Sequence, residues 1–143
     1  DQNGFLKRLN YKGAQLAMFD RAQRFSSDTN YLILVDLDNC RTGVFTGSRG
    51  NWDMKYYCEC TPGKPSTPTV TGTFETLSTK YCLSTDSRAI YCTQFYGGYF
   101  FHSILESTSE LGRQLSHGCV RLEWGNARWI WNNVPLGTTV NVY

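Results

Sequence analysis

Most of this chain is divided into short β-prone runs separated by turn residues, and this pattern limits the folds open to it. Residues 31–35 are apolar and β-prone, residues 36–39 carry turn chemistry, and residues 40–46 resume a strand. A further turn at residues 47–51 precedes an alternating run at residues 52–60. Short strands joined by turns predict a mainly β sandwich with a small helical content.

The strand pattern continues after an interruption. Residues 61–68 hold three of the four prolines, and because proline cannot donate a ladder hydrogen bond, this stretch is expected to be a loop. Residues 106–115 are polar, with Gly112 as a breaker, and are expected to form another connection. Further strands are expected at residues 73–79, 81–84, 89–102 and 138–143, with a hairpin turn at residues 85–88.

Two helices are expected, one near each end of the chain. Apolar side chains recur every three or four residues between positions 11 and 25, which predicts a docking or linker helix within residues 1–30. The second helix is expected at residues 126–133, near the C-terminus, with Asn126 as its N-cap.

Length and charge exclude several classes of protein. The 143 residues fit one domain with a single core. A net charge of +2 provides no strong basic field, so no nucleic-acid partner is predicted. No apolar run of about 18 residues suggests a membrane span, and no secretory leader is recognisable at Asp1. The oligomeric state is not indicated.

Six cysteines are many for a domain of this size. Cys82 and Cys92 are symmetric about the expected hairpin turn, so they could form a disulfide in an oxidising compartment. Cys58 and Cys60 would lie on one face of a strand, but no second cysteine pair or histidine cluster completes the four ligands of a structural zinc site. No metal is therefore expected.

Cys119 has the neighbours that a cysteine nucleophile requires. A free thiol with a pKa near 8.5 is mostly protonated at neutral pH, so it needs a base beside it. The only two histidines are His117, two residues before the cysteine, and His102, seventeen residues before it. Gly118 permits a backbone whose amides face an oxyanion. The pattern favours acyl transfer, and the alternative is an inert buried thiol.

Several segments around these residues resemble the catalytic domain of the L,D-transpeptidase (YkuD) family, bacterial enzymes that crosslink peptidoglycan. Residues 116–121 (SHGCVR) are similar to the family signature that contains the nucleophile. Residues 97–103 (GGYFFHS) are similar to the strand that ends in the catalytic histidine. Further similar segments are residues 68–74 (PTVTGTF), 127–131 and 137–140. The resemblance implies a YkuD-like β-sandwich and assigns residues 31–143 to the catalytic domain.

The resemblance also implies a reaction and a place for it. The donor would be a peptidoglycan tetrapeptide stem, cleaved before its terminal D-alanine, and the amine of a second stem would resolve the thioester to give a 3→3 crosslink. No cofactor is implied, and β-lactams of the carbapenem class are expected to inhibit. The protein would work outside the membrane, at the cell wall or anchored to the outer face of the membrane, with a leader or anchor outside these residues.

Roles for the remaining site residues complete the hypothesis. The resemblance implies that the main-chain carbonyl of Ser103 orients the His102 imidazole. His117 and Gly118 are expected to shape the oxyanion pocket. Arg121 is expected to bind a stem carboxylate through its guanidinium fork. The residues assigned to substrate contact besides Arg121 are Tyr96, Tyr99 and Ser116, and the Ser116 hydroxyl is also expected to make structural hydrogen bonds.

Three classes of function stay open at this point. An acyltransferase predicts that Cys119 carries the reaction, and water in place of the acceptor amine would make it an L,D-carboxypeptidase. A non-catalytic module that binds wall peptide predicts an unreactive Cys119. A redox or metal-thiol protein predicts a disulfide or bound zinc at the same residue. The presence of His102 together with Cys119 favours the first class.

Overall fold

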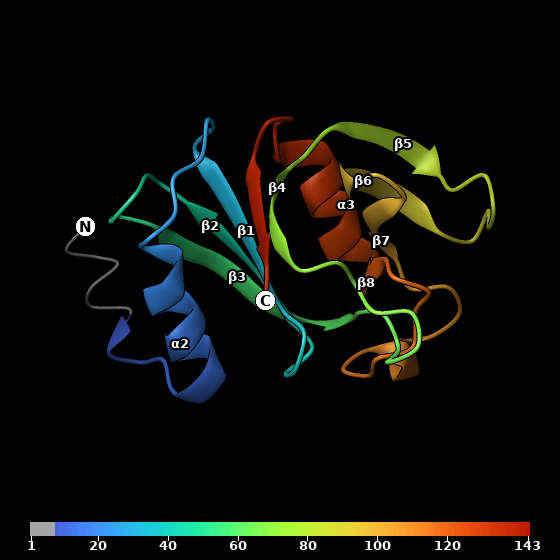
Figure 1. Ribbon diagram of the computed structural model, residues 1–143, viewed down its shortest axis with the longest axis horizontal. Helices are drawn as coiled ribbons and strands as arrows, with labels where there is room; N and C mark the ends of the chain where they lie inside the picture. Colours follow the sequence, from blue (N-terminus) through green and yellow to red (C-terminus); the bar gives the residue numbers. More distant parts are fainter. Residues whose placement is uncertain (1–7) are drawn as a thin grey trace.

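The computed structural model describes residues 8–143, and its strands form one curled sheet (Figure 1). The strands are β1 (Tyr31–Asp36), β2 (Arg41–Thr46), β3 (Asp53–Thr61), β4 (Gly72–Glu75), β5 (Ser78–Cys82), β6 (Ile90–Tyr96), β7 (Tyr99–Ser103), β8 (Val120–Leu122) and β9 (Thr139–Val142). Their order across the sheet is β4-β9-β1-β2-β3-β8-β7-β6-β5. The helices are α2 (Gly13–Ala22), α3 (Trp124–Asn133) and the single 3₁₀ turn η1 (Thr108–Glu110). Within this part of the chain, no helix has the length and apolar content needed to cross a membrane.

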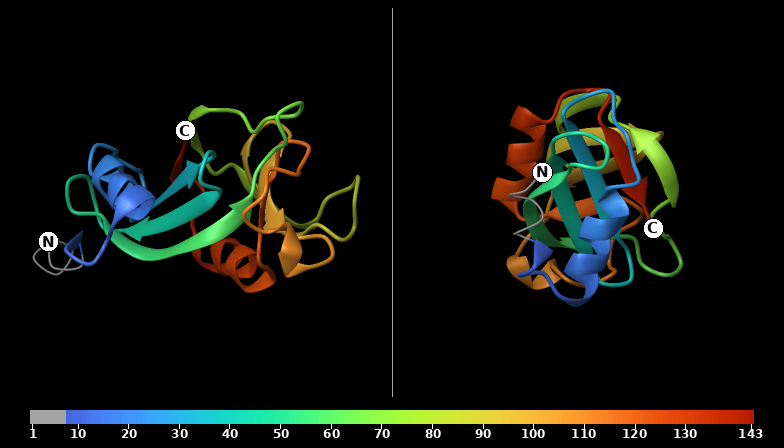
Figure 2. Two further views of the ribbon diagram at one scale, coloured as in Figure 1. Left: turned by 90° about the horizontal axis from the view of Figure 1, so that it is seen from below. Right: turned by 90° about the vertical axis from the view of Figure 1, so that its left-hand side faces the viewer.

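The sheet curls because β3 belongs to both of its halves. The strand pairs with β2 over most of its length and with β8 through Cys60 and Thr61, and Figure 2 shows it as a long curved ribbon between the two halves. The consecutive strands β4 and β5 lie at opposite edges of the sheet. At their junction the Thr76 N–H donates to the Thr138 carbonyl and the Leu77 N–H donates to the Gln94 carbonyl, which draws the two edges together. The mainly β prediction is confirmed, and the two layers of the expected sandwich are two halves of one sheet.

The main core lies between these halves, with α3 packed into it. Its buried side chains include Ile33, Val44, Phe95, Phe101, Val120, Leu122, Ile130 and Val140. Because successive residues of a strand face opposite sides, β7 directs Tyr99 and Phe101 to this core and presents Phe100 and His102 on the other face. That other face carries the site described below.

The N-terminal helix α2 covers the outer face of the β1–β2–β3 half. Its Met18, Phe19 and Ala22 pack against a second buried cluster, and the Met18 thioether lies over Gly43, where a side chain would collide with it. Strand β1 is consequently buried on both faces, which explains why residues 32–35 are continuously apolar rather than alternating. The boundary drawn between residues 30 and 31 stays a prediction, and residues 1–7 of that expected region lie outside the described part.

The predictions of two strands were wrong, because each predicted stretch contains a break. Residues 89–102 form the hairpin β6–β7 instead of one strand, since the Gly97-Gly98 pair makes a turn in which Gly97 adopts a φ of +48°. Residues 73–79 divide into β4 and β5, which belong to opposite edges of the sheet. The short strand β8, inside the cysteine motif, was not predicted.

One further local prediction, the N-cap of the second helix, was also wrong. The second helix begins at Trp124, and its N-cap is Glu123, whose carboxylate accepts from the Gly125 N–H, so Asn126 lies within the helix. The Cys82–Cys92 disulfide that the sequence left open is absent, and both thiols are free. The register pairs Cys82 with Ile90 and Lys80 with Cys92, so the two cysteines are not opposite each other.

Replacing Met18 by alanine should show how much α2 contributes to the fold. Met18 is fully buried, so the free energy of unfolding is expected to fall by about 2–5 kcal/mol, measured by urea denaturation. The half-exposed Leu136 is the control, and Leu136→Ala should change the same quantity by less than about 0.5 kcal/mol. Equally small changes in both variants would contradict an integral role for α2.

Candidate active site

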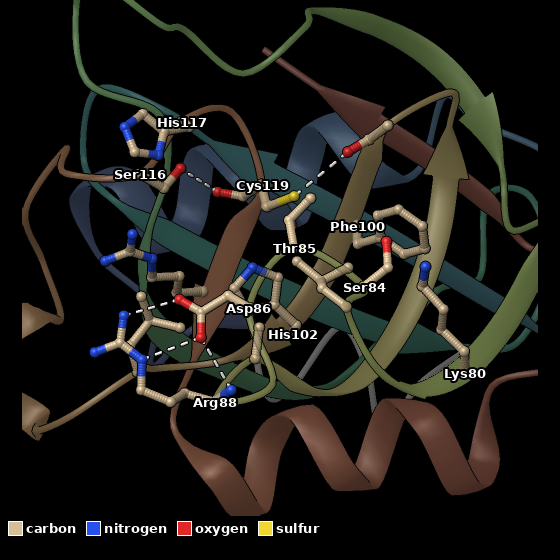
Figure 3. Close-up of a pocket in the computed structure, with 15 residues that line it drawn as sticks. Lys80, Ser84, Thr85, Asp86, Arg88, Phe100, His102, Ser116, His117 and Cys119 are labelled. Carbon is tan, nitrogen blue, oxygen red and sulfur yellow. Dashed lines mark hydrogen bonds and ion pairs between the residues drawn. The ribbon is translucent and has the colours of Figure 1, made fainter.

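A pocket of about 470 Å³ lies over β5 to β8, on the face of this half of the sheet that is turned away from the core (Figure 3). The connection between β5 and β6, residues 83–89, forms one wall of it. The lining residues that matter for chemistry are Lys80, Asp86, Phe100, His102, Cys119 and Arg121. The pocket therefore brings together the two residues, His102 and Cys119, on which the sequence hypothesis depends.

The register of β7 and β8 explains why His102 and Cys119 line the same pocket. β7 and β8 pair in parallel, with Phe101 opposite Val120 and His102 opposite Arg121. The same register places Cys119, just before β8, beside Phe100. Because alternate residues share a face, His102 and Cys119 project from adjoining strands toward the same pocket.

The imidazole of His102 is buried and has a fixed orientation. Its Nδ1 lies 2.7 Å from the Ser103 carbonyl oxygen, which can only accept, so Nδ1 carries the hydrogen and Nε2 is the basic nitrogen of the neutral ring. Burial lowers the pKa of His102, the Ser103 carbonyl opposes that change, and the positive charge of Arg121 adds to it. The ring is therefore neutral at pH 7 and able to accept a proton.

The thiol of Cys119 is also neutral in this arrangement. Its Sγ donates to the Gly98 carbonyl at 3.5 Å. Burial raises the pKa of Cys119, while the Phe100 N–H and the charges of Arg121 and Lys80 oppose the increase. The sulfur therefore carries a proton, which a base would have to remove for it to act as a nucleophile.

The cysteine loop is held by a serine hydroxyl and requires a glycine. Gly118 adopts a φ of +130°, and a Cβ there would lie 2.9 Å from the Tyr99 ring. The Gly118 N–H donates to Ser116 Oγ at 3.1 Å, and that hydroxyl donates to the Cys119 carbonyl. The Gly118 N–H is therefore engaged within the loop, and the expectation that His117 and Gly118 shape an oxyanion pocket stays a prediction. The Ser116 hydroxyl makes the expected structural hydrogen bonds, and its expected contact with a substrate stays a prediction.

A second segment, from the proline-containing loop, supports the cysteine loop from outside. Thr69 is buried, and its Oγ1 donates to the Gly118 carbonyl at 2.7 Å and accepts from the Gly63 N–H at 2.9 Å. Thr67 Oγ1 donates to the Ser116 carbonyl at 2.8 Å. No role was predicted for either threonine, although Thr69 belongs to the PTVTGTF segment. The contacts join residues 49 apart in the chain, so local patterns carry no signal for them.

Ser103 contributes its side chain as well as its carbonyl. The hydroxyl is fully buried, donates to the Arg88 carbonyl at 3.2 Å and accepts from the Ile90 N–H at 3.1 Å. These bonds fasten the end of the 83–89 wall to β7, directly beside the histidine. A role for this hydroxyl was missed from the sequence.

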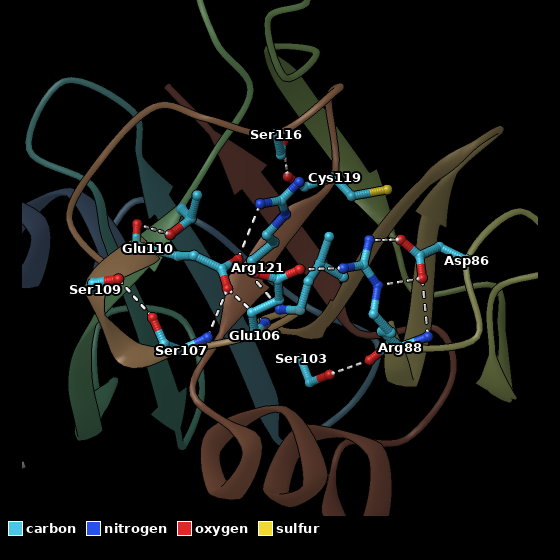
Figure 4. Close-up of polar contacts among 12 residues, drawn as sticks. Asp86, Arg88, Ser103, Glu106, Ser107, Ser109, Glu110, Ser116, Cys119 and Arg121 are labelled. Carbon is cyan, nitrogen blue, oxygen red and sulfur yellow. Dashed lines mark hydrogen bonds and ion pairs between the residues drawn. The ribbon is translucent and has the colours of Figure 1, made fainter.

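Arg121 is engaged by a carboxylate of the protein (Figure 4). Its Nη1 lies 3.0 Å from Glu110 Oε1, and both side chains are largely buried. Glu110 also accepts from the backbone N–H groups of residues 105, 106 and 107. Burial opposes ionisation of Glu110, but these donors and Arg121 together lower its pKa. The expected pairing of Arg121 with a substrate carboxylate therefore competes with an internal ion pair.

The remaining predicted residues are divided between the pocket and other surfaces. His117 lines the pocket rim, is exposed, and points its ring away from the Cys119 sulfur in Figure 3. Tyr99 packs on the core side of β7, and Tyr96 stacks on Phe74 with ring centroids 4.8 Å apart. Neither tyrosine lines this pocket, and their expected substrate contact stays a prediction. The face that each strand residue occupies decides this outcome.

The other thiols have different environments. Burial raises the pKa of Cys58 and of Cys92 to about 12, so both stay protonated at neutral pH. All six cysteines are free. Across residues 8–143, no three His, Cys, Asp or Glu side chains are grouped in a way that would hold a metal ion.

The sequence and fold are similar to those of L,D-transpeptidases. The YkuD family model, described as the L,D-transpeptidase catalytic domain, matches residues 30–142. L,D-transpeptidase 1 of Mycobacterium tuberculosis is 29% identical over 126 residues, covering 76% of this chain and 50% of that protein. The chain therefore spans about half the length of the curated relatives it matches.

Solved structures agree with this similarity. A fused Zn-dependent amidase/peptidase/peptidoglycan-binding domain-containing protein from Clostridium acetobutylicum superposes with a TM-score of 0.74 at 32% identity, covering 89% of this chain and 58% of that one. The L,D-transpeptidase LdtMt1 in complex with imipenem superposes with a TM-score of 0.70 at 24% identity, covering 80% of this chain and 59% of that one. The second likeness concerns the fold alone.

Replacing Thr69 by valine should loosen the cysteine loop. Two buried backbone groups would lose their partner, so the free energy of unfolding is expected to fall by about 1–3 kcal/mol in urea denaturation. Thr69→Ser keeps the hydroxyl and should retain most of the stability. The exposed Thr79 is the control, with an expected change below about 0.5 kcal/mol for Thr79→Val. Unchanged stability in Thr69→Val would show that the bonds are dispensable.

The pH profile of Cys119 alkylation by iodoacetamide should have two rising limbs. The lower limb reflects neutral His102 acting as base, and because the His102 pKa is lowered, its midpoint is expected below about pH 6.5. The upper limb reflects free thiolate and lies above the usual thiol range, since the Cys119 pKa is raised.

The effect of Arg121 on this profile supplies the check. Arg121→Gln removes a positive charge near His102, so the lower midpoint should move to higher pH. Arg128→Gln, on the exposed side of α3, should leave it in place. A midpoint that moves to lower pH in Arg121→Gln would refute the assigned cause.

Proposed function

Because the chain belongs to the YkuD family of L,D-transpeptidase catalytic domains, we propose that it is a cysteine acyltransferase that forms 3→3 crosslinks between peptidoglycan stems. The observation that carries the proposal is the parallel pairing of β7 with β8, which turns Cys119 and an oriented His102 toward one pocket. The hydrogen bond from His102 Nδ1 to the Ser103 carbonyl supports it, because Nε2 is then the free base.

The reaction begins with proton transfer inside the pocket. The Cys119 side chain turns from the Gly98 carbonyl toward His102, and Nε2 takes the thiol proton as the sulfur attacks the carbonyl carbon of the third stem residue. The bond to the terminal D-alanine then breaks, and the imidazolium gives its proton to the departing amine. General-base assistance of this kind contributes about 10² to 10⁴ in rate.

The acyl-enzyme is resolved by a second stem. Its amine attacks the thioester, gives up a proton to His102 and releases Cys119 as the thiol. The oxyanion formed in each half-reaction is bound by main-chain N–H groups of the cysteine loop other than that of Gly118, since Ser116 engages the Gly118 N–H. The His117 and Cys119 amides are the candidates.

The substrate and the inhibitors follow from the same assignment. Peptidoglycan lies outside the cytoplasmic membrane, so we place the protein there, at the cell wall or on the outer face of that membrane. Imipenem binds the structurally similar L,D-transpeptidase LdtMt1, and the strained ring of a carbapenem offers an acyl carbon to a thiolate. We therefore expect carbapenems to acylate Cys119.

Cys119→Ala tests the proposal directly. Release of D-alanine from tetrapeptide muropeptides is expected to fall by about 10³-fold or more, because the nucleophile is lost. Intact-protein mass should show one imipenem adduct in the wild type and none in the variant. Cys82→Ala removes another partly exposed thiol and is expected to keep both activities.

Other outcomes identify other functions. Full turnover by Cys119→Ala would refute the cysteine mechanism. Release of D-alanine by the wild type without crosslinked product would make the protein an L,D-carboxypeptidase. Saturable muropeptide binding with neither turnover nor acylation would identify a non-catalytic binding module.

A further inference from the structure

The pocket contains three side chains of permanent positive charge, and two of them already have carboxylate partners. Arg88 contacts Asp86 at 2.8 Å and Glu106 at 2.6 Å. Arg121 contacts Glu110 at 3.0 Å. Lys80 has no carboxylate within ion-pair distance in the described part of the chain. The pocket therefore holds one cation whose charge the protein leaves uncompensated.

Lys80 is directed toward the reacting residues. It lies on the edge strand β5, opposite Cys92 of β6, and the β6–β7 register brings Cys92 beside His102. Its Nζ is 5.0 Å from the centroid of the Phe100 ring, and Phe100 neighbours Cys119. Figure 3 shows the Lys80 side chain extending toward that ring. A cation over an aromatic face is attracted to it, so the ring favours this inward position.

The position of Lys80 on an edge strand has a second physical explanation, protection of that edge, and the contact with Phe100 distinguishes this explanation from a role in the pocket. Lysines on edge strands discourage pairing with other sheets. Lys80 is exposed at this edge, as that role requires, but its ammonium also lies over the Phe100 ring and lines the pocket, which edge protection does not require. Burial raises the pKa of Cys119, and the charge of Lys80 opposes this, which agrees with a lysine close to the sulfur.

We propose that Lys80 binds a carboxylate of the donor stem next to Cys119. The inference rests on the proposed function, in which the departing D-alanine carries a carboxylate one carbon from the scissile nitrogen. The side-chain carboxylate of the third stem residue is a second source of the same chemistry. A cation at this place selects donors that present a carboxylate beside the scissile bond.

The first test does not require turnover. Iodoacetate and iodoacetamide form the same S–C bond with expulsion of iodide, but only iodoacetate carries a carboxylate. Peptide mass mapping gives the alkylation rate of Cys119 alone. Lys80→Met is expected to lower the iodoacetate-to-iodoacetamide rate ratio by about 5-fold, and any change that the lost charge causes in the reactivity of Cys119 itself affects both reagents and cancels in the ratio.

Two variants control this measurement. Lys80→Arg keeps the charge and should preserve the ratio. Lys55→Met removes the same charge from an exposed position on β3, outside the pocket, and should also preserve it. An unchanged ratio in Lys80→Met, or an equal fall in Lys55→Met, would overturn the proposal.

The second test identifies which carboxylate is bound. Tetrapeptide donors with a free terminal carboxylate are compared with C-terminal amides, and donors with diaminopimelate at the third position are compared with lysine donors. Loss of kcat/KM in Lys80→Met only for free-acid donors assigns the terminal carboxylate, and loss only for diaminopimelate donors assigns the side chain. Equal loss for every donor would overturn carboxylate recognition. If the wild type turns over no donor, the proposed function fails, while the alkylation ratio still decides the role of Lys80.

Discussion

The parallel hydrogen-bonded pairing of β8 with β7 sets the positions of both reacting side chains. Parallel neighbours need a long connection, and here residues 104–119 supply it. Glu110 folds that connection back by accepting from three backbone N–H groups and from the Arg121 guanidinium, so its ion pair with Arg121 stabilises the crossover. The histidine and the cysteine are thereby held on neighbouring strands, where a proton can pass between them.

The cysteine itself is outside regular structure and depends on contacts from a remote segment. Gly118 tolerates a backbone conformation that other residues rarely adopt, and Ser116 and Thr69 together occupy its N–H and carbonyl groups. A loop held by these hydrogen bonds has little freedom to move, which keeps the sulfur in a defined position.

Burial sets the electrostatics of the site. It lowers the pKa of His102 and raises the pKa of Cys119, which favours the neutral form of both side chains. The two arginines are neutralised by carboxylates, which limits the positive field in the pocket. Lys80 is left as the cation available to an incoming anion.

Local sequence patterns identified the strand-rich composition, the two helices and the 61–68 loop, because periodicity and proline content are properties of neighbouring residues. The chemistry of a thiol, which needs a base, identified the pairing of Cys119 with a histidine. The family resemblance added residues 31–143 as one unit, and the family match covers nearly the same range. Tertiary structure decided the separation of β4 from β5, the burial of Tyr99 on the core side, the partner of Arg121 and the support from Thr69. Each of these depends on strand register or on contacts between distant residues, and a shift of one residue in register would turn every side chain of a strand to the other face.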